Sequence, residues 1–232
     1  MRISEIYVSR QGEGRLTGTP SVFVRTTGCN LRCDFCDTPF TSWQPSGDSR
    51  SLRSIINEVQ RLSESGVGPV QHVVLTGGEP MLSRDVVALC ELLSDFHITI
   101  ETAGTCDRNV RCDLMSISPK LSNSTPSFSR AGGWRERHEG LRFRPNVVRR
   151  LIEKYDYQLK FVVDRTEDVA EILDYLGLIE TVDPTRVLLM PQGIHPDELE
   201  RRAQWLIPLC QRYGFSYCPR QHIFWYGNQR GT

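Results

Sequence analysis

The sequence predicts an α/β fold, an incomplete (partial) β/α barrel of about six parallel strands. Short apolar runs alternate with segments of helical periodicity, which is typical of parallel strands joined by helices. Six such runs are too few to close a barrel of eight strands. The chain has 232 residues, 39% hydrophobic and 24% charged, as expected for a single globular domain over residues 1–232.

Six strands and five helices are expected along the chain. The strands are Ser21–Thr26, His72–Thr76, Ile98–Thr102, Leu114–Ser118, Gln158–Val163 and Arg186–Met190. The helices are Leu52–Leu62, Val86–Leu93, Asn146–Lys154, Thr166–Leu176 and Asp197–Tyr213, with Ser51 capping the first and Pro196 opening the last. Pro208 should kink or break the last helix. Residues 103–113 are too few for an ordinary crossover helix.

Two further segments complete the chain. Residues 122–145 are rich in Ser, Pro, Gly and Arg and lack helical periodicity, so we expect a long loop, either a lid or disordered. Its arginines could form a nucleic-acid strip, but a solvated loop is favoured; they are Arg130, Arg135, Arg137, Arg142 and Arg144. Residues 214–232 form a C-terminal tail.

The charge balance favours a small-molecule substrate. Lys plus Arg and Asp plus Glu number 28 each, whereas a nucleic-acid-binding surface normally shows a basic excess, so no direct nucleic-acid partner is expected. No apolar run approaches the length of a membrane span, and the N-terminus lacks the apolar core of a signal peptide. We therefore expect no membrane partner, a cytoplasmic location and cysteines without disulfides.

Three of the eight cysteines define a candidate metal-binding loop at residues 28–38. Cys29, Cys33 and Cys36 are separated by three and then two residues, a spacing that lets one loop present three thiolates to a cubic iron–sulfur cluster. Three ligands leave one of four irons open to a small molecule. The alternative is a structural zinc site, but closed zinc sites need four ligands and no second pair follows nearby. The other five cysteines show no cluster-like spacing.

A second motif, Thr76-Gly77-Gly78-Glu79-Pro80, follows the second predicted strand. Glycines allow a ligand to approach the backbone closely, although a tight turn would use them equally well. Together with the cysteine loop and Phe35, the motif resembles the one that holds the amino group of S-adenosylmethionine (SAM) in radical SAM enzymes. This resemblance implies a 4Fe-4S cluster and SAM as cofactors.

Polar residues at the ends of other predicted strands fall where β/α barrels place their active sites. Glu101 could accept hydrogen bonds from ribose hydroxyls or be an exposed acid. Lys120, after Ser118 and Pro119, could meet a carboxylate or be solvated. Gln192 ends the sixth strand.

Features outside these motifs narrow the resemblance to one family. The segment Arg10-Gln11-Gly12-Glu13, the sequence Cys36-Asp37-Thr38 and the tail His222-Ile223-Phe224-Trp225 resemble the 7-carboxy-7-deazaguanine synthase family of queuosine and deazapurine biosynthesis. The likeness covers essentially the whole chain. It implies a carbon–nitrogen lyase that converts 6-carboxy-5,6,7,8-tetrahydropterin to 7-carboxy-7-deazaguanine by hydrogen abstraction, ring contraction and loss of ammonia. It also implies a homodimer and a reductant such as flavodoxin or ferredoxin.

The resemblance assigns roles to individual residues. Thr38 matches a Mg²⁺ ligand, and Arg25 matches an arginine that binds the substrate carboxylate. Further substrate contacts match Arg10, Gln11, Gly12, Glu13 and Thr76, with the terminal Thr232 as an additional candidate. The SAM site matches Phe35, Cys36, Asp37, Gly78, Glu79, Glu101, Ser118, Pro119, Lys120 and Gln192.

Two other functions remain open on the sequence alone. Another radical SAM enzyme, such as a glycyl-radical-enzyme activase, would share the cysteine loop but act on a protein. A non-enzymatic iron–sulfur module would be expected to use four cysteine ligands, and only three are suitably spaced.

Overall fold

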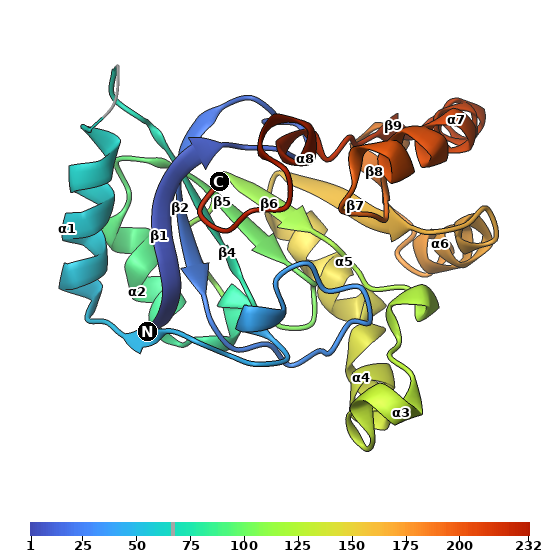
Figure 1. Cartoon of the computed structure of the whole chain (residues 1–232), viewed down its shortest axis with the longest axis horizontal. Coiled ribbons are helices and arrows are strands. Elements are labelled where there is room, and N and C mark those ends of the chain that lie inside the picture. The colour runs from blue at the N-terminus through green and yellow to red at the C-terminus, as the bar shows by residue number, and fades with distance from the viewer. Residues whose placement is uncertain (66–67) are drawn as a thin grey trace.

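The computed structural model describes residues 1–65 and 68–232, and its strands form one open sheet (Figure 1). The strand order is β3-β1-β2-β4-β5-β6-β7-β8-β9. All six predicted strands are present: β2 (Pro20–Thr26), β4 (His72–Gly77), β5 (His97–Thr102), β6 (Leu114–Ile117), β7 (Tyr157–Val163) and β8 (Val187–Pro191). With the short β9 (Ser216–Tyr217) they pair in parallel, which confirms the incomplete barrel.

An N-terminal strand was not predicted. β1 (Arg2–Arg10) runs antiparallel to β2, with Arg10 opposite Pro20 and Ile3 opposite Thr26, and the two-residue β3 (Asp48–Ser49) pairs with it. Most β1 side chains are half-buried or exposed rather than buried, so the strand lacks the apolar run that identified the others.

Four of the helices pack on the outer face of the sheet (Figure 1). α1 (Leu52–Ser63) packs on β1 and β2, α5 (Pro145–Lys154) on β6, α6 (Asp168–Gly177) on β7, and α7 (Pro196–Tyr213) on β8 and β9. The remaining helices are α2 (Asp85–Leu92), α3 (Phe128–Ala131), α4 (Trp134–Arg142) and α8 (Gln221–Tyr226). Short 3₁₀ turns occupy Pro39–Thr41, Pro80–Leu82, Ser122–Ser124 and Pro184–Arg186. No helix in the described ranges is long and apolar enough to cross a membrane.

Alternation along the strands separates the core from the opposite, inner face. On β2, Val22 and Val24 belong to the hydrophobic core, whereas Phe23 and Arg25 line a cavity. Burying the apolar set against the helices therefore leaves the other set of side chains to form the wall of a site.

The prediction of a long loop over residues 122–145 was wrong, because this segment contains a 3₁₀ turn, α3, α4 and the start of α5. The buried anchor of α4 is His138, whose Nε2 lies 3.1 Å from the hydroxyl of Ser124. A single polar anchor produces none of the apolar periodicity by which helices are found in sequences.

Pro208 does not end its helix, which continues to Tyr213. Pro208 and Gln204, whose carbonyl would have accepted the missing hydrogen bond, both lie on the exposed face of α7, where water can replace the lost donor.

Two other predictions are confirmed: Ser51 caps α1 through the Ser54 amide, and residues 103–113 cross from β5 to β6 without a helix.

Candidate active site

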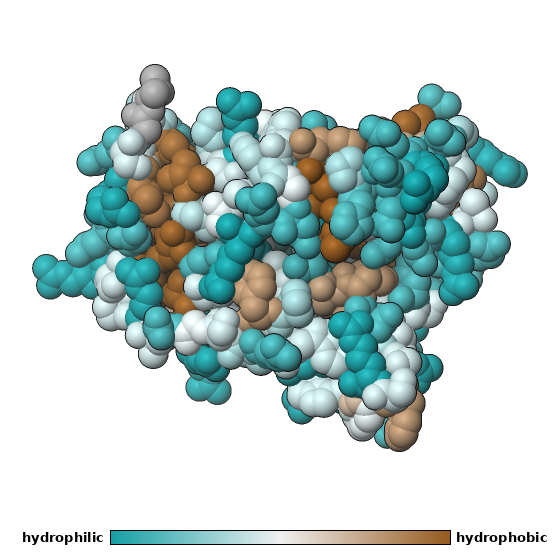
Figure 2. Space-filling view, in the orientation of Figure 1, coloured by the Kyte–Doolittle hydropathy of each residue, from teal (hydrophilic) through white to brown (hydrophobic). Residues whose placement is uncertain are grey.

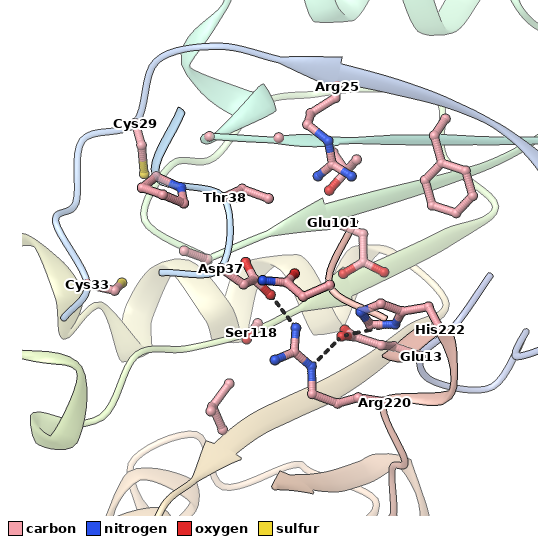
Figure 3. Close-up of a pocket in the computed structure, with 18 of the residues that line it drawn as sticks. Glu13, Arg25, Cys29, Cys33, Asp37, Thr38, Glu101, Ser118, Arg220 and His222 are labelled. Atoms are coloured by element: carbon pink, nitrogen blue, oxygen red, sulfur yellow. Dashed lines mark hydrogen bonds and ion pairs between the residues drawn. The ribbon is translucent and has the colours of Figure 1, made fainter. Parts of the chain in front are cut away.

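A cavity of about 550 Å³ lies on the inner face of the sheet. Cys29 and Cys33 lie at one end of it, and Arg25, Glu13 and His222 lie at the other (Figure 3). The cysteine end is at the carboxyl ends of the parallel strands. The opposite end is lined by Gln11 and Glu13, from the connection between the antiparallel β1 and β2, and by residues of the tail.

The cysteine loop leaves the end of β2 and is tied to residues 41–43, which follow it in the chain. The Gly28 amide donates to the Thr41 carbonyl (2.8 Å), and the Trp43 indole donates to the Cys33 carbonyl (3.0 Å). The Cys36 sulfur lies 3.2 Å from the Ser42 hydroxyl. These contacts fix the loop at the mouth of the cavity.

The glycine pair after β4 allows the cysteine loop to approach. A Cβ added at Gly78 would collide with the carbonyl of Gly28, and Gly77 has a φ of +124°, which side chains rarely adopt. The Glu79 amide donates to the same Gly28 carbonyl at 2.9 Å. The two motifs found in the sequence are therefore in direct contact.

Glu79 does not line the main cavity. Its side chain is 2% exposed and accepts hydrogen bonds from the Met81 amide (3.1 Å), the Thr102 hydroxyl (2.8 Å) and the Ala103 amide (2.8 Å). Burial raises its pKa, although these donors oppose the rise. In this geometry Glu79 joins the ends of β4 and β5 and positions the glycine pair.

A buried ion network forms the floor of the cavity. Lys160 Nζ lies 2.5 Å from Glu13 Oε2 and 2.9 Å from Glu101 Oε2, and Arg220 Nε lies 3.2 Å from Glu13 Oε1. Arg220 also pairs with Asp37. Burial disfavours these charges, but their partners outweigh it, so the pKa of Lys160 is raised and that of Glu13 is lowered. The network is therefore charged at neutral pH.

The segment Arg10–Glu13 enters the cavity. The Gln11 amide donates to Glu101 Oε1 at 3.3 Å. A Cβ on Gly12 would collide with the His222 ring, so glycine permits the tail to pack there, and the Gln221 amide donates to the Gly12 carbonyl at 2.8 Å. Arg10, Gln11 and Glu13 line the cavity, whereas Gly12 supports it from behind.

Arg25 lies on the cavity wall in a fixed orientation. Its Nε donates to Glu5 Oε1 (2.6 Å) and its Nη2 to the Tyr7 hydroxyl (2.5 Å). Glu5 and Tyr7 belong to β1 and were not predicted as site residues, because the strand that carries them was missed.

The other predicted residues divide into two groups. The cavity is lined by Phe35, Asp37, Thr38, Thr76, Gly78, Glu101, Ser118, Lys120, Gln192 and Thr232. Cys36, Pro119 and Glu79 are not part of that lining. Lys120 Nζ donates to the Ser118 hydroxyl at 2.7 Å, and Thr38 Oγ1 accepts from Thr41 Oγ1 at 3.3 Å.

Lys160 and Arg220 are the main site residues that the sequence analysis missed. Lys160 had a detectable signal, because it is the only charged residue in the apolar run Tyr157–Val163. Arg220 had none, since nothing in a polar tail distinguishes one arginine from its neighbours.

The donor set fits a 4Fe-4S cluster. In residues 1–65 and 68–232, no three His, Cys, Asp or Glu side chains gather as the ligands of a single metal ion would. A cubic cluster instead takes each thiolate on a different iron, which three separated cysteines at a cavity mouth can provide. Burial raises the pKa of Cys29 and Cys33 to about 12, so these thiols would release their protons on binding iron.

These features define the class of the protein. The family model of the radical SAM superfamily matches residues 23–176, and the chain is a radical SAM enzyme. It is 46% identical to the 7-carboxy-7-deazaguanine synthase of Rhodopirellula baltica, over 99% of this chain and 88% of that relative. The corresponding enzyme of Halobacterium salinarum is 44% identical, over 95% and 88%. The crystal structure of QueE from Escherichia coli matches with a TM-score of 0.68 and 26% identity, covering 95% of this chain and 94% of that one. The chain belongs to the 7-carboxy-7-deazaguanine synthase family.

Proposed function

We propose that this chain converts 6-carboxy-5,6,7,8-tetrahydropterin to 7-carboxy-7-deazaguanine with release of ammonia. One observation carries the proposal beyond the family relationship. A single cavity joins the cysteine end to a polar end that contains Gln11, Glu13 and Arg25. A flat, partly apolar pterin with one carboxylate matches a cavity of this size and polarity.

The polar end supplies complementary groups for the substrate. Glu13 keeps its charge because Lys160 and Arg220 lower its pKa, so its carboxylate would accept hydrogen bonds from ring N–H groups. Arg25, held by Glu5 and Tyr7, would bind the substrate carboxylate. Arg10, Gln11, Thr76 and Thr232 would complete the contacts, with Gly12 giving the segment its shape.

The cysteine end would hold the cofactors. Cys29, Cys33 and Cys36 would bind the cluster. SAM would lie against two residues of the cysteine loop, Phe35 and Asp37, and against residues at or just after the strand ends: Gly78, Glu101, Ser118, Lys120 and Gln192, with Glu79 and Pro119 behind them. When bound, the cluster and SAM would supply the 5′-deoxyadenosyl radical that removes hydrogen from C6 of the substrate. The protein's part is to orient the two molecules and exclude water.

Thr38 would bind Mg²⁺. Its hydroxyl lies on the cavity wall, and Mg²⁺ commonly uses one or two protein oxygens together with oxygens of the substrate. The neighbouring Asp37 pairs with Arg220, and the Thr38 hydroxyl follows Cys36 by two residues.

We also propose that the enzyme acts as a homodimer and takes its electron from a flavodoxin or ferredoxin. Figure 2 shows a hydrophobic band over α1 and β1, where Val8 is 39% exposed and Ile6 and Ile56 are half-buried. A second copy of the chain would cover this band.

Anaerobic turnover of the reconstituted protein with the carboxytetrahydropterin tests the activity. We expect a deazapurine product and ammonia in equal amounts under reducing conditions. Glu13→Gln should keep the cluster absorbance and lower turnover by about a hundredfold, since a charged hydrogen bond in a desolvated site is lost. Glu200→Gln, on the exposed face of α7, is the matched control. Absence of a deazapurine from a protein that binds its cluster and cleaves SAM would exclude this substrate.

Thr38→Ala tests the metal assignment. The variant should keep the absorbance of the cluster and lose the stimulation of turnover by Mg²⁺. Unchanged stimulation would place the Mg²⁺ ligand elsewhere.

A further inference from the structure

The segment that contains α3 and α4 is attached to the outside of the cysteine loop. The Arg32 amide donates to Nδ1 of the buried His138 at 3.1 Å, and the Asp34 amide donates to the Ser124 carbonyl at 2.8 Å. The Arg130 guanidinium pairs with Asp34 at 2.8 Å. None of these contacts reaches into the cavity, so the segment forms an outer surface close to the cysteines.

Arginines and one tryptophan dominate that surface. The ring of Trp134 lies between two guanidinium groups, 4.0 Å from Arg32 and 4.5 Å from Arg137. Arg32 lies between two cysteines in sequence and donates to the Cys29 carbonyl at 2.9 Å. We call Arg32, Arg130, Arg135, Arg137 and Trp134 the arginine face. Figure 2 shows a largely hydrophilic surface over α3 and α4.

The chain concentrates its positive charge here. Residues 126–154 contain eight cationic and three acidic side chains, although the whole chain is neutral, so the remainder has a formal charge of −5. Within the described parts of the chain, no carboxylate lies within ion-pairing distance of Arg32, Arg135 or Arg137. Their charges are therefore available to a partner.

We propose that the arginine face is the docking surface for an acidic protein that donates single electrons to the cluster. The donor would be oxidised by one electron, which a cluster held by Cys29, Cys33 and Cys36 would take up, so no other reactant is needed. Two features favour this partner. The face contacts the backbone of the cysteine loop directly, which gives a short path to the cluster. Its charge is opposite to that of a small acidic flavin or iron–sulfur protein, and such complementarity accelerates the encounter of transient partners.

Single-stranded RNA is the other macromolecule that could recognise arginines around a tryptophan. It is less favoured because the proposed substrate and product are free small molecules, and because RNA binding would not need contact with the cysteine loop. The experiment below separates the two partners. The turnover measurement in that experiment rests on the proposed function, whereas the binding measurement is independent of it.

The test compares a protein donor with a small reductant. The double variant Arg135→Glu/Arg137→Glu reverses two charges on the face, and Arg201→Glu/Arg212→Glu makes the same change on exposed positions of α7. For each holoenzyme we would measure the affinity for an acidic flavodoxin at low and high salt. Initial rates of turnover would be measured with reduced flavodoxin and with dithionite. A third variant, Arg135→Gln/Arg137→Gln, removes the charges with less disturbance of α4.

We expect the Arg135→Glu/Arg137→Glu variant to bind flavodoxin roughly tenfold or more weakly at low salt and to lose the same factor in flavodoxin-driven turnover. Its dithionite-driven turnover and cluster content should match the wild type, and the α7 control should match in every readout. The glutamine variant should show a smaller loss of the same kind. An equal loss with dithionite would mean that these arginines only support the fold, and the proposal would be overturned. It would also be overturned by unchanged flavodoxin affinity, including the case in which the variants lose affinity for single-stranded RNA instead. Failure of the proposed activity would abolish product with both reductants in the wild type while leaving the binding result intact.

Discussion

Replacing Lys160 by Met tests the ion network at the floor of the cavity. Lys160 is 3% exposed, and its Nζ contacts both Glu13 and Glu101. Met has a similar length and no charge. Removing one partner of a buried ion pair costs about 3–5 kcal/mol, mostly because the remaining charge is left without compensation. We expect a loss of this size in the free energy of unfolding.

In the Lys160→Met variant, Glu101 is the carboxylate that is left without a cation. Without Lys160, Glu13 keeps Arg220 at 3.2 Å. Glu101 keeps only the Gln11 amide at 3.3 Å among the described residues. A second substitution, Glu101→Gln, should therefore restore about half of the lost stability, whereas Glu13→Gln should restore little, because Glu13 is already compensated by Arg220.

Thermal or urea unfolding of the protein without its cluster provides the measurement. For a chain of this length, a loss of 3–5 kcal/mol lowers Tm by roughly 6–20 °C. Lys154→Met is the matched control, since Lys154 is exposed and its loss should stay within about 0.5 kcal/mol. A Lys160→Met loss below about 1 kcal/mol, or equal rescue by both glutamine substitutions, would refute this account of the network.

Three further predictions concern His138, Gly78 and Tyr7. Burial lowers the pKa of His138 to about 4 from 6.5; because the folded-state value is the lower one, stability is full above pH 6.5 and is lost as the pH falls toward 4. Urea unfolding at pH 5 should therefore show about 2 kcal/mol less stability from this group than at pH 7, a difference that His138→Gln should abolish. Gly78→Ala should cost about 1–3 kcal/mol by overpacking against Gly28 and should lower iron content on reconstitution. Gly177→Ala has open space around it and should instead be neutral or stabilising by up to about 1 kcal/mol, so equal stability of the two alanine variants would contradict the close approach. Tyr7→Phe removes the hydroxyl that holds Arg25, so KM for the pterin should rise a few-fold while the cluster spectrum is unchanged; an unaltered KM would exclude the positioning role.

The sequence was most informative where the chemistry is local. Cys29, Cys33 and Cys36 lie within eight residues, and the glycine pair directly follows a strand. Local sequence patterns therefore identify both motifs, which contact each other in the folded chain. The six parallel strands were equally accessible, because burial on both faces gives continuous apolar runs.

The parts that were missed depend on pairs of residues far apart in the chain. Lys160 and Glu13 are separated by 147 positions, and Arg220 and Glu13 by 207. No local pattern links such residues, so the network becomes visible only in the folded chain. The helix α4 was hidden for a related reason, since its anchor His138 is satisfied by Ser124 and Arg32 from other segments.

β2 connects the two segments that enter the cavity from opposite ends of the strand. The segment containing Gln11 and Glu13 precedes this strand and the cysteines follow it, and the strand itself has seven residues and is about 20 Å long. Deleting one residue inside β2 would shorten the strand and also turn Phe23 and Arg25 toward the helices. The connection at residues 16–19, in contrast, lies outside both strands. Length variation in this enzyme should therefore be tolerated at that connection and selected against within the strand.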